Sequence, residues 1–195
     1  MNLIEIIEAY AHCKENYNKE NSYHNWNHIE ELLKEMSSRG IIDDTSQKES
    51  ILLTYSILFH DIIYDPKKNN NEELSAMHFK SYSKERLSLG EKDVNVVYEA
   101  ILDTKWPHTG RSYIGQLLVD LDLCALCDEK RYKENGIKIE KEFEHLSEEE
   151  YIEGRTKWLT MMINKKFIYH TTFFTDGEDG RAFEILQNDL KEIRK

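Results

Sequence analysis

The sequence predicts an all-α protein, and three observations carry that prediction. Apolar residues recur at the i, i+3, i+4, i+7 spacing of a helix along most of the chain. The alternation typical of strands is absent, apart from the short and ambiguous stretch "FIYHTTFF". Glycine and proline, at 8 and 2 of 195 residues, are too few for a turn-rich β-protein. With 39% hydrophobic residues, the chain is expected to form one domain over 1–195.

The first half of the chain predicts three helices. An apolar stripe at 4–11 predicts the first, and "HIEELLKEM" predicts the second, which Arg39–Gly40 ends. Thr45 or Ser46 can cap the third, which runs through "ESILLTYSILFHDIIY". That segment is apolar almost all round, so we expect it to be the central buried helix. Pro66 and "KKNNN" predict a polar loop after it.

The second half continues the helical pattern. A helix over "EELSAMHFKSYSKERL" is expected to stop near Gly90, and another runs from Asp93 to about Thr104. The loop "KWPHTG" separates these from "IGQLLVDLDLCAL", an apolar segment that contains two aspartates. Three further helices are expected near 129–144, 147–164 and 178–194, with a turn at "TDGEDG" before the last.

Charge and composition narrow the class of function. A net charge of −11 argues against binding to long nucleic acid, although a cation could still hold a small anionic substrate. The start "MNLIEIIEAY" lacks the basic region of a signal peptide, and no apolar run approaches the roughly 20 residues of a membrane span. The protein is therefore expected to be cytoplasmic, with no membrane partner. Cys124 and Cys127 form a C-x-x-C without a second pair, so we interpret them as ordinary part-buried residues.

Polar residues of the metal-ligand type occur within three apolar helices. They are His24 and His28 at i, i+4, the adjacent pair His60 and Asp61, and Asp120 with Asp122. Burying an isolated carboxylate costs many kcal/mol unless it is paired or bound to a metal. These residues are therefore predicted to meet at a divalent cation. Imidazole and carboxylate together suit Mn, Fe, Co, Ni or Zn, and carboxylates with water also suit Mg. Taken alone, His28 could instead be a hydrogen-bonded core histidine.

The segments "YHNWNHI", "FHDIIYDP", "NEELSA", "ILDTKWPH" and "DLDLCAL" resemble those of a known family. They are similar to the HD superfamily of metal-dependent phosphohydrolases, and more closely to a bacterial group of predicted HD phosphohydrolases. "EGRTKWL" and "FIYHTTFF" match more loosely. The resemblance implies an HD-domain-like helical bundle, with a metal-site core at about 20–130 and C-terminal helices at about 131–195. Cys127 stands where the group usually has a glycine, and this change does not touch a ligand.

Position by position, the resemblance implies which side chains hold the metal. His28 would be the first ligand, His60 and Asp61 the central pair, and Asp122 the last. His24 and Asp120 remain alternates to His28 and Asp122. The identity of the divalent metal ion stays open among Mn, Mg, Fe, Co, Ni and Zn.

The resemblance also implies an activity. It is hydrolysis of a phosphomonoester or phosphodiester in a small phosphorylated substrate, with a nucleotide as the favoured class. A competing interpretation is a noncatalytic helical module that binds a metal or another ligand. A third is an HD-type lyase or oxygenase with a di-iron pair, which would need further ligands such as His108 or His24. The oligomeric state stays open.

Further catalytic residues are expected near the loop that follows His60–Asp61. Asp65 and Glu72 flank that loop and are candidates for a general base or acid. "NE-x-x-SA" favours Glu72, although a carboxylate in a first helical turn also interacts well with the helix dipole. His108 could contact phosphate or a second metal, or be a loop histidine. Other candidates are cations for phosphate (Lys105, Lys67 and Lys68) and aromatic residues that either stack on a base or belong to the core (Tyr23, Trp26, Tyr64 and Trp106).

Overall fold

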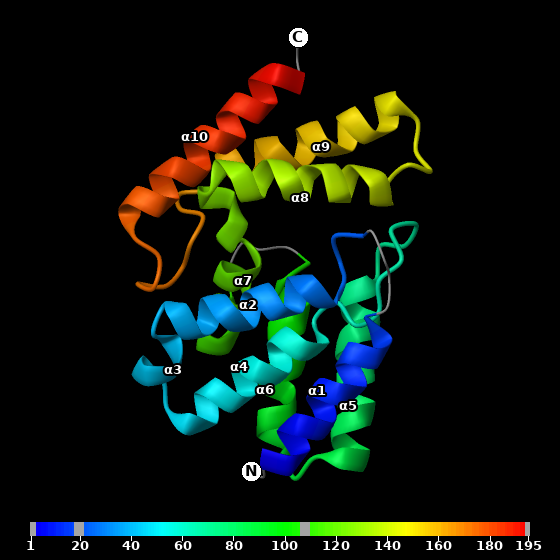
Figure 1. Ribbon diagram of the computed structural model, residues 1–195, viewed down its shortest axis with the longest axis vertical. Coiled ribbons are helices and arrows are strands. Elements are labelled where there is room, and N and C mark those ends of the chain that lie inside the picture. Colours follow the sequence, from blue (N-terminus) through cyan, green and yellow to red (C-terminus); the bar gives the residue numbers. More distant parts are fainter. Residues whose placement is uncertain (1–2, 18–21, 106–109, 194–195) are drawn as a thin grey trace. The chain divides into compact units, whose positions relative to one another are not determined.

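The computed structural model describes residues 3–17, 22–105 and 110–193, and all regular structure within those ranges is helical (Figure 1). The prediction of an all-α protein is therefore confirmed. The helices are α1 (Leu3–Asn16), α2 (Trp26–Ser38), α3 (Ile41–Asp44), α4 (Gln47–Phe59), α5 (Asn71–Arg86), α6 (Glu91–Asp103), α7 (Tyr113–Asp122), the 3₁₀ helix η1 (Cys124–Cys127), α8 (Glu129–Glu142), α9 (Glu148–Ile163) and α10 (Asp176–Ile193). None of them combines the length and hydropathy that crossing a bilayer requires.

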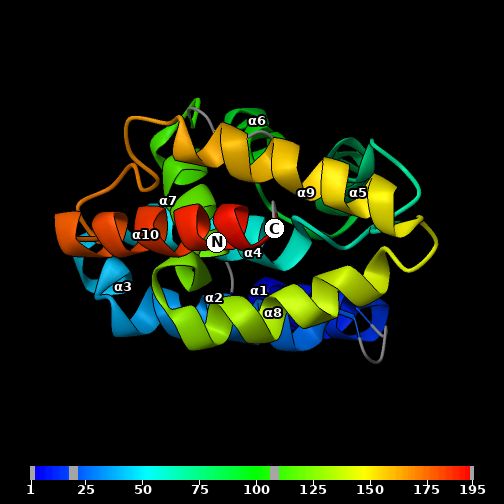
Figure 2. The same ribbon diagram turned by 90° about the horizontal axis from the view of Figure 1, so that it is seen from above.

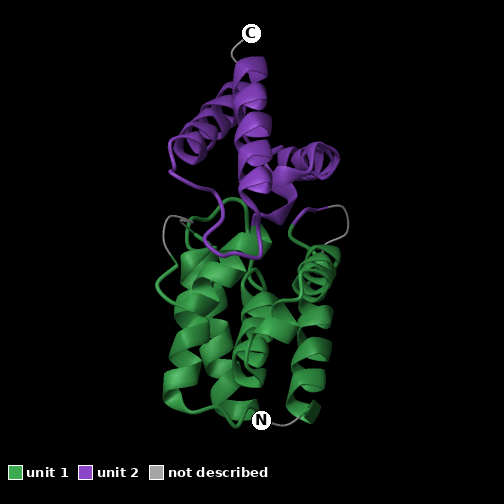
Figure 3. Cartoon of the chain, turned by 90° about the vertical axis from the view of Figure 1, so that its left-hand side faces the viewer, with its two compact units in different colours: residues 1–20, 24–122 green, residues 21–23, 123–195 purple. Residues whose placement is uncertain are grey.

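The chain divides into two compact units, which Figure 3 shows in green and purple. The first consists of residues 1–20 and 24–122 and contains α1 to α7. The second consists of residues 21–23 and 123–195 and contains η1 and α8 to α10. This division into compact units does not test the expectation that residues 1–195 form a single domain, which stays a prediction.

Helix α4 is the centre of the first unit, as its uniformly apolar sequence predicts. It contacts α1, α2, α3, α5, α6 and α7. Every residue in its last two turns except Thr54 is buried: Leu52, Leu53, Tyr55, Ser56, Ile57, Leu58 and Phe59. Of the two predicted caps, Ser46 is the one used. Its hydroxyl accepts the Glu49 N–H, and the Glu49 carboxylate accepts the Ser46 N–H in return.

Helix α2 begins later than the histidine spacing predicts. The Asn25 side chain accepts the N–H groups of Asn27 and His28, which makes Asn25 the N-cap. His24 therefore lies before the helix, and the prediction that His24 and His28 share one helical face is wrong. At the other end the predicted stop is confirmed. Gly40 has a φ of 72°, which a residue with a side chain rarely adopts.

The second unit is built on η1 and three helices. Helix α10 contacts α9 and η1, and η1 contacts α8. Figure 2 shows α8, α9 and α10 as separate rods. The expected turn at "TDGEDG" is wrong, because α10 already begins at Asp176. Thr175 and Glu178 exchange hydrogen bonds in the pattern of a capping box, and so start the helix within that stretch.

Candidate metal centre

Three helix ends in the first unit bring together the side chains of His28, His60 and Asp122. His28 lies in the first turn of α2, His60 directly follows α4, and Asp122 is the last residue of α7. One nitrogen or oxygen atom from each lies within 4.8 Å of the other two. The two histidines are buried and the aspartate is half-buried. Among the described residues, this is the one group with the geometry to hold a metal ion.

The contacts within this group centre on one carboxylate oxygen. Oδ1 of Asp122 lies 3.2 Å from His28 Nε2 and 3.7 Å from His60 Nε2. Asp61 extends the group, because its Oδ2 lies 3.1 Å from His60 Nε2. Donor atoms bound at about 2.1 Å to one ion lie about 3.0 Å apart at a right angle and about 3.4 Å apart at a tetrahedral angle. The 3.1 and 3.2 Å spacings match such edges and the 3.7 Å spacing is longer than either. The predicted ligand Asp61 contacts His60 but is not one of the three side chains whose ligand atoms all lie within 4.8 Å of one another.

The His60 ring is held with one nitrogen facing the carboxylates. Its Nδ1 donates to the carbonyl oxygen of Ile57 at 2.9 Å, so Nδ1 carries a proton. Nε2 is buried and makes no hydrogen bond to any described residue. In the neutral tautomer, Nε2 carries no proton and lies 3.1 Å from Asp61 Oδ2 and 3.7 Å from Asp122 Oδ1, two negatively charged oxygens. This arrangement requires a cation at that position, either a proton or a metal ion.

Electrostatics favour positive charge at the same position. Burial by itself would lower the pKa of His60, but the charge of Asp61 and the nearby Asp122 oxygen raise that pKa well above its usual value. Burial by itself would raise the pKa of Asp122, but His28 and His60 hold that pKa below its usual value. The pKa of Asp61 is lowered against burial in the same way, chiefly by His60. Two ionised carboxylates beside two imidazoles form a donor set that suits a divalent transition metal.

The alternates His24 and Asp120 have different surroundings. His24 stacks on Tyr64, with ring centroids 3.6 Å apart, and its Nε2 lies 3.8 Å from Asp61 Oδ2. It therefore borders the group on the side of Asp61. Asp120 is fully buried, so the possibility that it faces solvent is excluded, and it is outside the group of three.

Tyr17, which no sequence motif indicates, reaches the same place from the end of α1. Its hydroxyl accepts the backbone N–H of Asp61 at 3.1 Å. The side chain is buried, with 3% of its surface exposed. Burial, followed by the charge of Asp61, raises the pKa of Tyr17 well above its usual value, so the phenol stays protonated. Tyr17 and Asp61 are 44 positions apart, and no local pattern connects them.

The predicted catalytic carboxylates lie around the loop beyond Asp61. Asp65 accepts the Lys67 N–H with Oδ1, and its Oδ2 lies 3.6 Å from Lys68 Nζ. Glu72 lies in the first turn of α5, 3.6 Å from Lys105 Nζ. Lys105 also binds Glu73, at 2.8 Å, so its charge is shared with two carboxylates. His108 lies outside the described residues.

The motif "NE-x-x-SA" has a structural role that sequence reasoning missed. Asn71 and Ser75 lie one turn apart on α5, and both are buried. The Ser75 hydroxyl accepts the N–H of Ile63 at 3.1 Å and donates to its carbonyl oxygen at 3.2 Å. Asn71 makes the equivalent pair of bonds to the backbone of Asp65. Two side chains therefore fix the segment that follows His60–Asp61.

Two of the four aromatic candidates for base stacking, Trp26 and Tyr64, have partners within the first unit. Trp26 packs edge-on against Tyr10 at 4.7 Å, and its Nε1 donates to Glu30 at 2.8 Å. Tyr64 stacks on His24. Tyr23 is half-buried, and Trp106 lies outside the described residues. Trp26 and Tyr64 thus pack within the protein itself.

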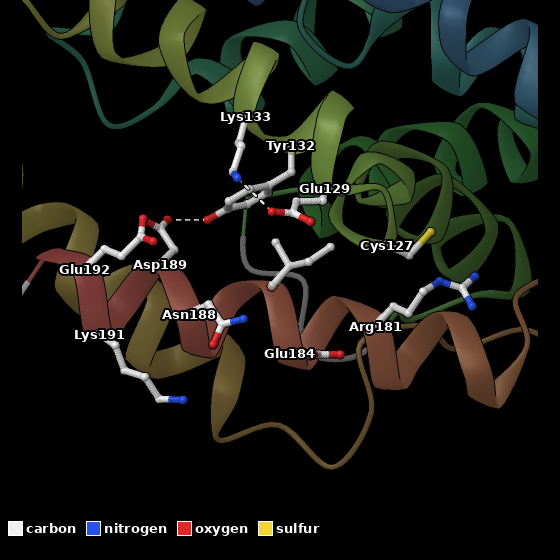
Figure 4. A pocket seen from close by; sticks show the side chains of 11 residues that line it. Cys127, Glu129, Tyr132, Lys133, Arg181, Glu184, Asn188, Asp189, Lys191 and Glu192 are labelled. Atoms are coloured by element: carbon white, nitrogen blue, oxygen red, sulfur yellow. Dashed lines mark hydrogen bonds and ion pairs between the residues drawn. The ribbon is translucent and has the colours of Figure 1, made fainter.

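The second unit contains a polar pocket of about 430 Å³ (Figure 4). The side chains in Figure 4 come from α8, α10 and Cys127. Asp189 in its wall accepts hydrogen bonds from Tyr132 and from Arg155, the latter at 2.9 Å. These bonds join the three helices of the unit, because Arg155 lies on α9. They give Arg155 in "EGRTKWL" a structural role.

The C-x-x-C pair lies on η1. Arg131 donates to Cys124 Sγ at 3.4 Å, and Cys127 Sγ donates to the Cys124 carbonyl oxygen at 3.3 Å. Cys124 is buried and Cys127 half-buried, as expected for ordinary residues of a helix.

The candidate metal centre thus consists of His28, His60 and Asp122, with Asp61 beside them and Tyr17 behind Asp61. Comparisons with protein-family models, with curated proteins and with solved structures returned no match.

Proposed function

We propose that this protein is a divalent-metal-dependent phosphohydrolase of the HD type that acts on a small phosphorylated molecule, with a nucleotide as the favoured substrate class. The observation that supports the proposal is the buried Nε2 of His60, which faces two carboxylates without a hydrogen-bond partner among the described residues. The family resemblance of "YHNWNHI", "FHDIIYDP" and "DLDLCAL" supplies the reaction class.

His28, His60 and Asp122 would hold the metal, with Asp61 as the fourth ligand. A divalent cation there supplies Lewis acidity to a phosphoryl oxygen and a lowered pKa for a bound water. The chain keeps the His60 ring in the tautomer that offers Nε2, through its bond to the Ile57 carbonyl oxygen. Part of the Asp122 side chain, 23%, is exposed, which leaves the group an approach from solvent.

Proton transfer would come from the loop and helix that follow Asp61. In this proposal Glu72 is the base or orients the base, and Lys105 restrains it at 3.6 Å. Asp65 is the second candidate, and its contacts with Lys67 and Lys68 tie it to the turn. Asn71 and Ser75 fix this turn to α5, so both carboxylates keep a defined place relative to the His60–Asp61 pair.

The test is a panel of nucleotides and phosphodiesters assayed for phosphate release and for diester cleavage. Protein stripped with a chelator is reloaded separately with Mn, Mg, Co, Ni or Fe. The wild type and His145→Ala, in which an exposed histidine is replaced, should both show metal-dependent turnover. His60→Ala should fall to background. Equal activity in His60→Ala, or activity without metal, would overturn the proposal. Bound metal with no turnover across the panel would favour the noncatalytic module.

A further inference from the structure

We infer that Tyr17 is a positioning residue of the metal centre, which sets the place of the Asp61 carboxylate by binding the Asp61 backbone. This inference rests on the metal centre of the proposed function and extends it to a residue that lies in no motif. The contact that carries it is the 3.1 Å hydrogen bond from the Asp61 N–H to the Tyr17 hydroxyl.

This hydrogen bond compensates for a change at the end of α4. In a continuing α-helix, the N–H of Asp61 would donate to the carbonyl oxygen of Ile57. That oxygen instead accepts the Nδ1 proton of His60 at 2.9 Å. The Asp61 N–H takes its acceptor from Tyr17. This exchange of hydrogen-bond partners therefore ends the helix, fixes the tautomer of His60 and anchors the backbone of Asp61.

Tyr17 is itself held firmly enough to act as an anchor. Its own N–H donates to the Cys13 carbonyl oxygen at 3.0 Å, which extends the hydrogen-bond pattern of α1. Its ring lies 6.1 Å from that of Trp26, two positions before His28. The phenol thus joins the end of α1 to the segments that carry His28 and Asp61.

The Tyr17→Phe variant keeps the ring and removes the acceptor. The Asp61 N–H then loses its partner, and the carboxylate is no longer held beside His60 Nε2. Loss of a group that orients a metal ligand typically weakens metal affinity about 10- to 100-fold. We expect a loss of that size for Co²⁺, measured by calorimetric titration of the chelator-stripped full chain.

A matched control is Tyr55→Phe. Tyr55 is also fully buried in the first unit, and its hydroxyl has no hydrogen-bond partner among the described residues. Tyr55→Phe should bind Co²⁺ as the wild type does. The visible absorption of bound Co²⁺ provides a second readout. Its band positions should change in Tyr17→Phe, because the ligand geometry changes, and stay constant in Tyr55→Phe.

A double-mutant cycle separates positioning through Asp61 from a general loosening of the fold. Asp61→Ala removes the carboxylate and keeps the backbone N–H. If Tyr17 acts through that carboxylate, adding Tyr17→Phe to Asp61→Ala should cost no further Co²⁺ affinity. Additive losses, or wild-type affinity in Tyr17→Phe, would overturn the inference and leave the proposed function standing. Absence of Co²⁺ binding by the wild type would overturn both.

Discussion

The Asn71 side chain forms a reciprocal pair of hydrogen bonds with the backbone N–H and carbonyl groups of Asp65. Asn71 Oδ1 accepts the Asp65 N–H at 3.1 Å, and Asn71 Nδ2 donates to the Asp65 carbonyl oxygen at 2.9 Å. The amide thus replaces the backbone partner that a neighbouring strand would supply. Since Asn71 is buried, these bonds are shielded from water.

Replacing Asn71 should destabilise the turn it holds. In Asn71→Ala, the backbone groups of Asp65 lose both bonds, which should lower the free energy of unfolding by about 1–3 kcal/mol. Urea unfolding followed by circular dichroism measures the change. Asn70→Ala is the control, because Asn70 is exposed and makes no side-chain cap. Equal stability of the two variants would contradict this role for Asn71.

Gly115 allows α7 to approach a buried carboxylate. A Cβ atom at this position would lie 2.4 Å from Asp103 Oδ2, which accepts the Arg111 N–H at 2.7 Å. Gly115→Ala must displace that carboxylate, so we expect a loss of about 1–3 kcal/mol in the free energy of unfolding. Gly154→Ala, in α9 with open space around the Cβ position, should gain about 0.5–1 kcal/mol. Thermal melts of both variants measure the contrast, and a neutral Gly115→Ala would show that Asp103 can move freely.

A pair of histidines outside the candidate metal centre is expected to make stability depend on pH. His12 Nε2 and His78 Nε2 lie 3.0 Å apart, and burial lowers the pKa of both rings. The unfolded chain therefore binds protons at a higher pH than the folded chain does. Above about pH 6.5 both rings are neutral in the folded and unfolded chain, so the free energy of unfolding does not depend on them. Below that pH the unfolded chain takes up protons first, so the free energy of unfolding falls as the pH drops toward the lowered pKa of the folded state.

The measurement for this pair is the free energy of unfolding at several pH values between about 5 and 8, with chelator present. The double variant His12→Asn, His78→Asn should lose less stability on acidification than the wild type. His145→Asn, at an exposed position, should keep the wild-type slope. A double variant with an unchanged slope would show that the pair does not titrate in this range.

The proposed role of Asp61 as a metal ligand can be tested apart from catalysis. Asp61→Ala should keep its helical circular dichroism, because α4 ends before residue 61 and Asp122 still faces His60. Its Co²⁺ affinity should fall by at least about tenfold, since one of the donor atoms is removed. Unfolding of this variant where metal-free wild type stays folded would assign Asp61 a structural role instead.

Much of the fold was accessible from the sequence because its signals are local. The apolar segment at 49–64 indicated the central helix, although α4 ends at Phe59 and not at Tyr64 as expected. Gly40 indicated the end of α2. Two predictions were wrong although local signals indicate the correct structure: the start of α2 and the turn before α10. Asn25 is a strong N-cap residue and excludes His24 from α2. Thr175 and Glu178 have the spacing of a capping box, which starts α10 within the expected turn.

The candidate site was predictable only where its residues differ from their surroundings. Ligand-type side chains stand out in apolar helices, which made His28, His60 and Asp122 candidates. The preference for His28 and Asp122 over His24 and Asp120 came from the family resemblance. Tyr17 was missed because a tyrosine directly after an amphipathic helix is ordinary, and its contact with Asp61 spans 44 positions. His78 was missed because its partner, His12, lies 66 positions away. Contacts of this kind arise only from packing in three dimensions.

The contact between His28 and Asp122 joins positions 94 residues apart in the chain. A ribosome synthesises α2 and α4 well before α7, so a nascent chain carries both histidines for some time without the aspartate that faces them. During translation those histidines cannot form the complete ligand group. The group becomes available when residue 122 has emerged and α7 has packed against α2 and α4. In the proposed metal centre, the complete set of ligands therefore forms only after the first unit has assembled.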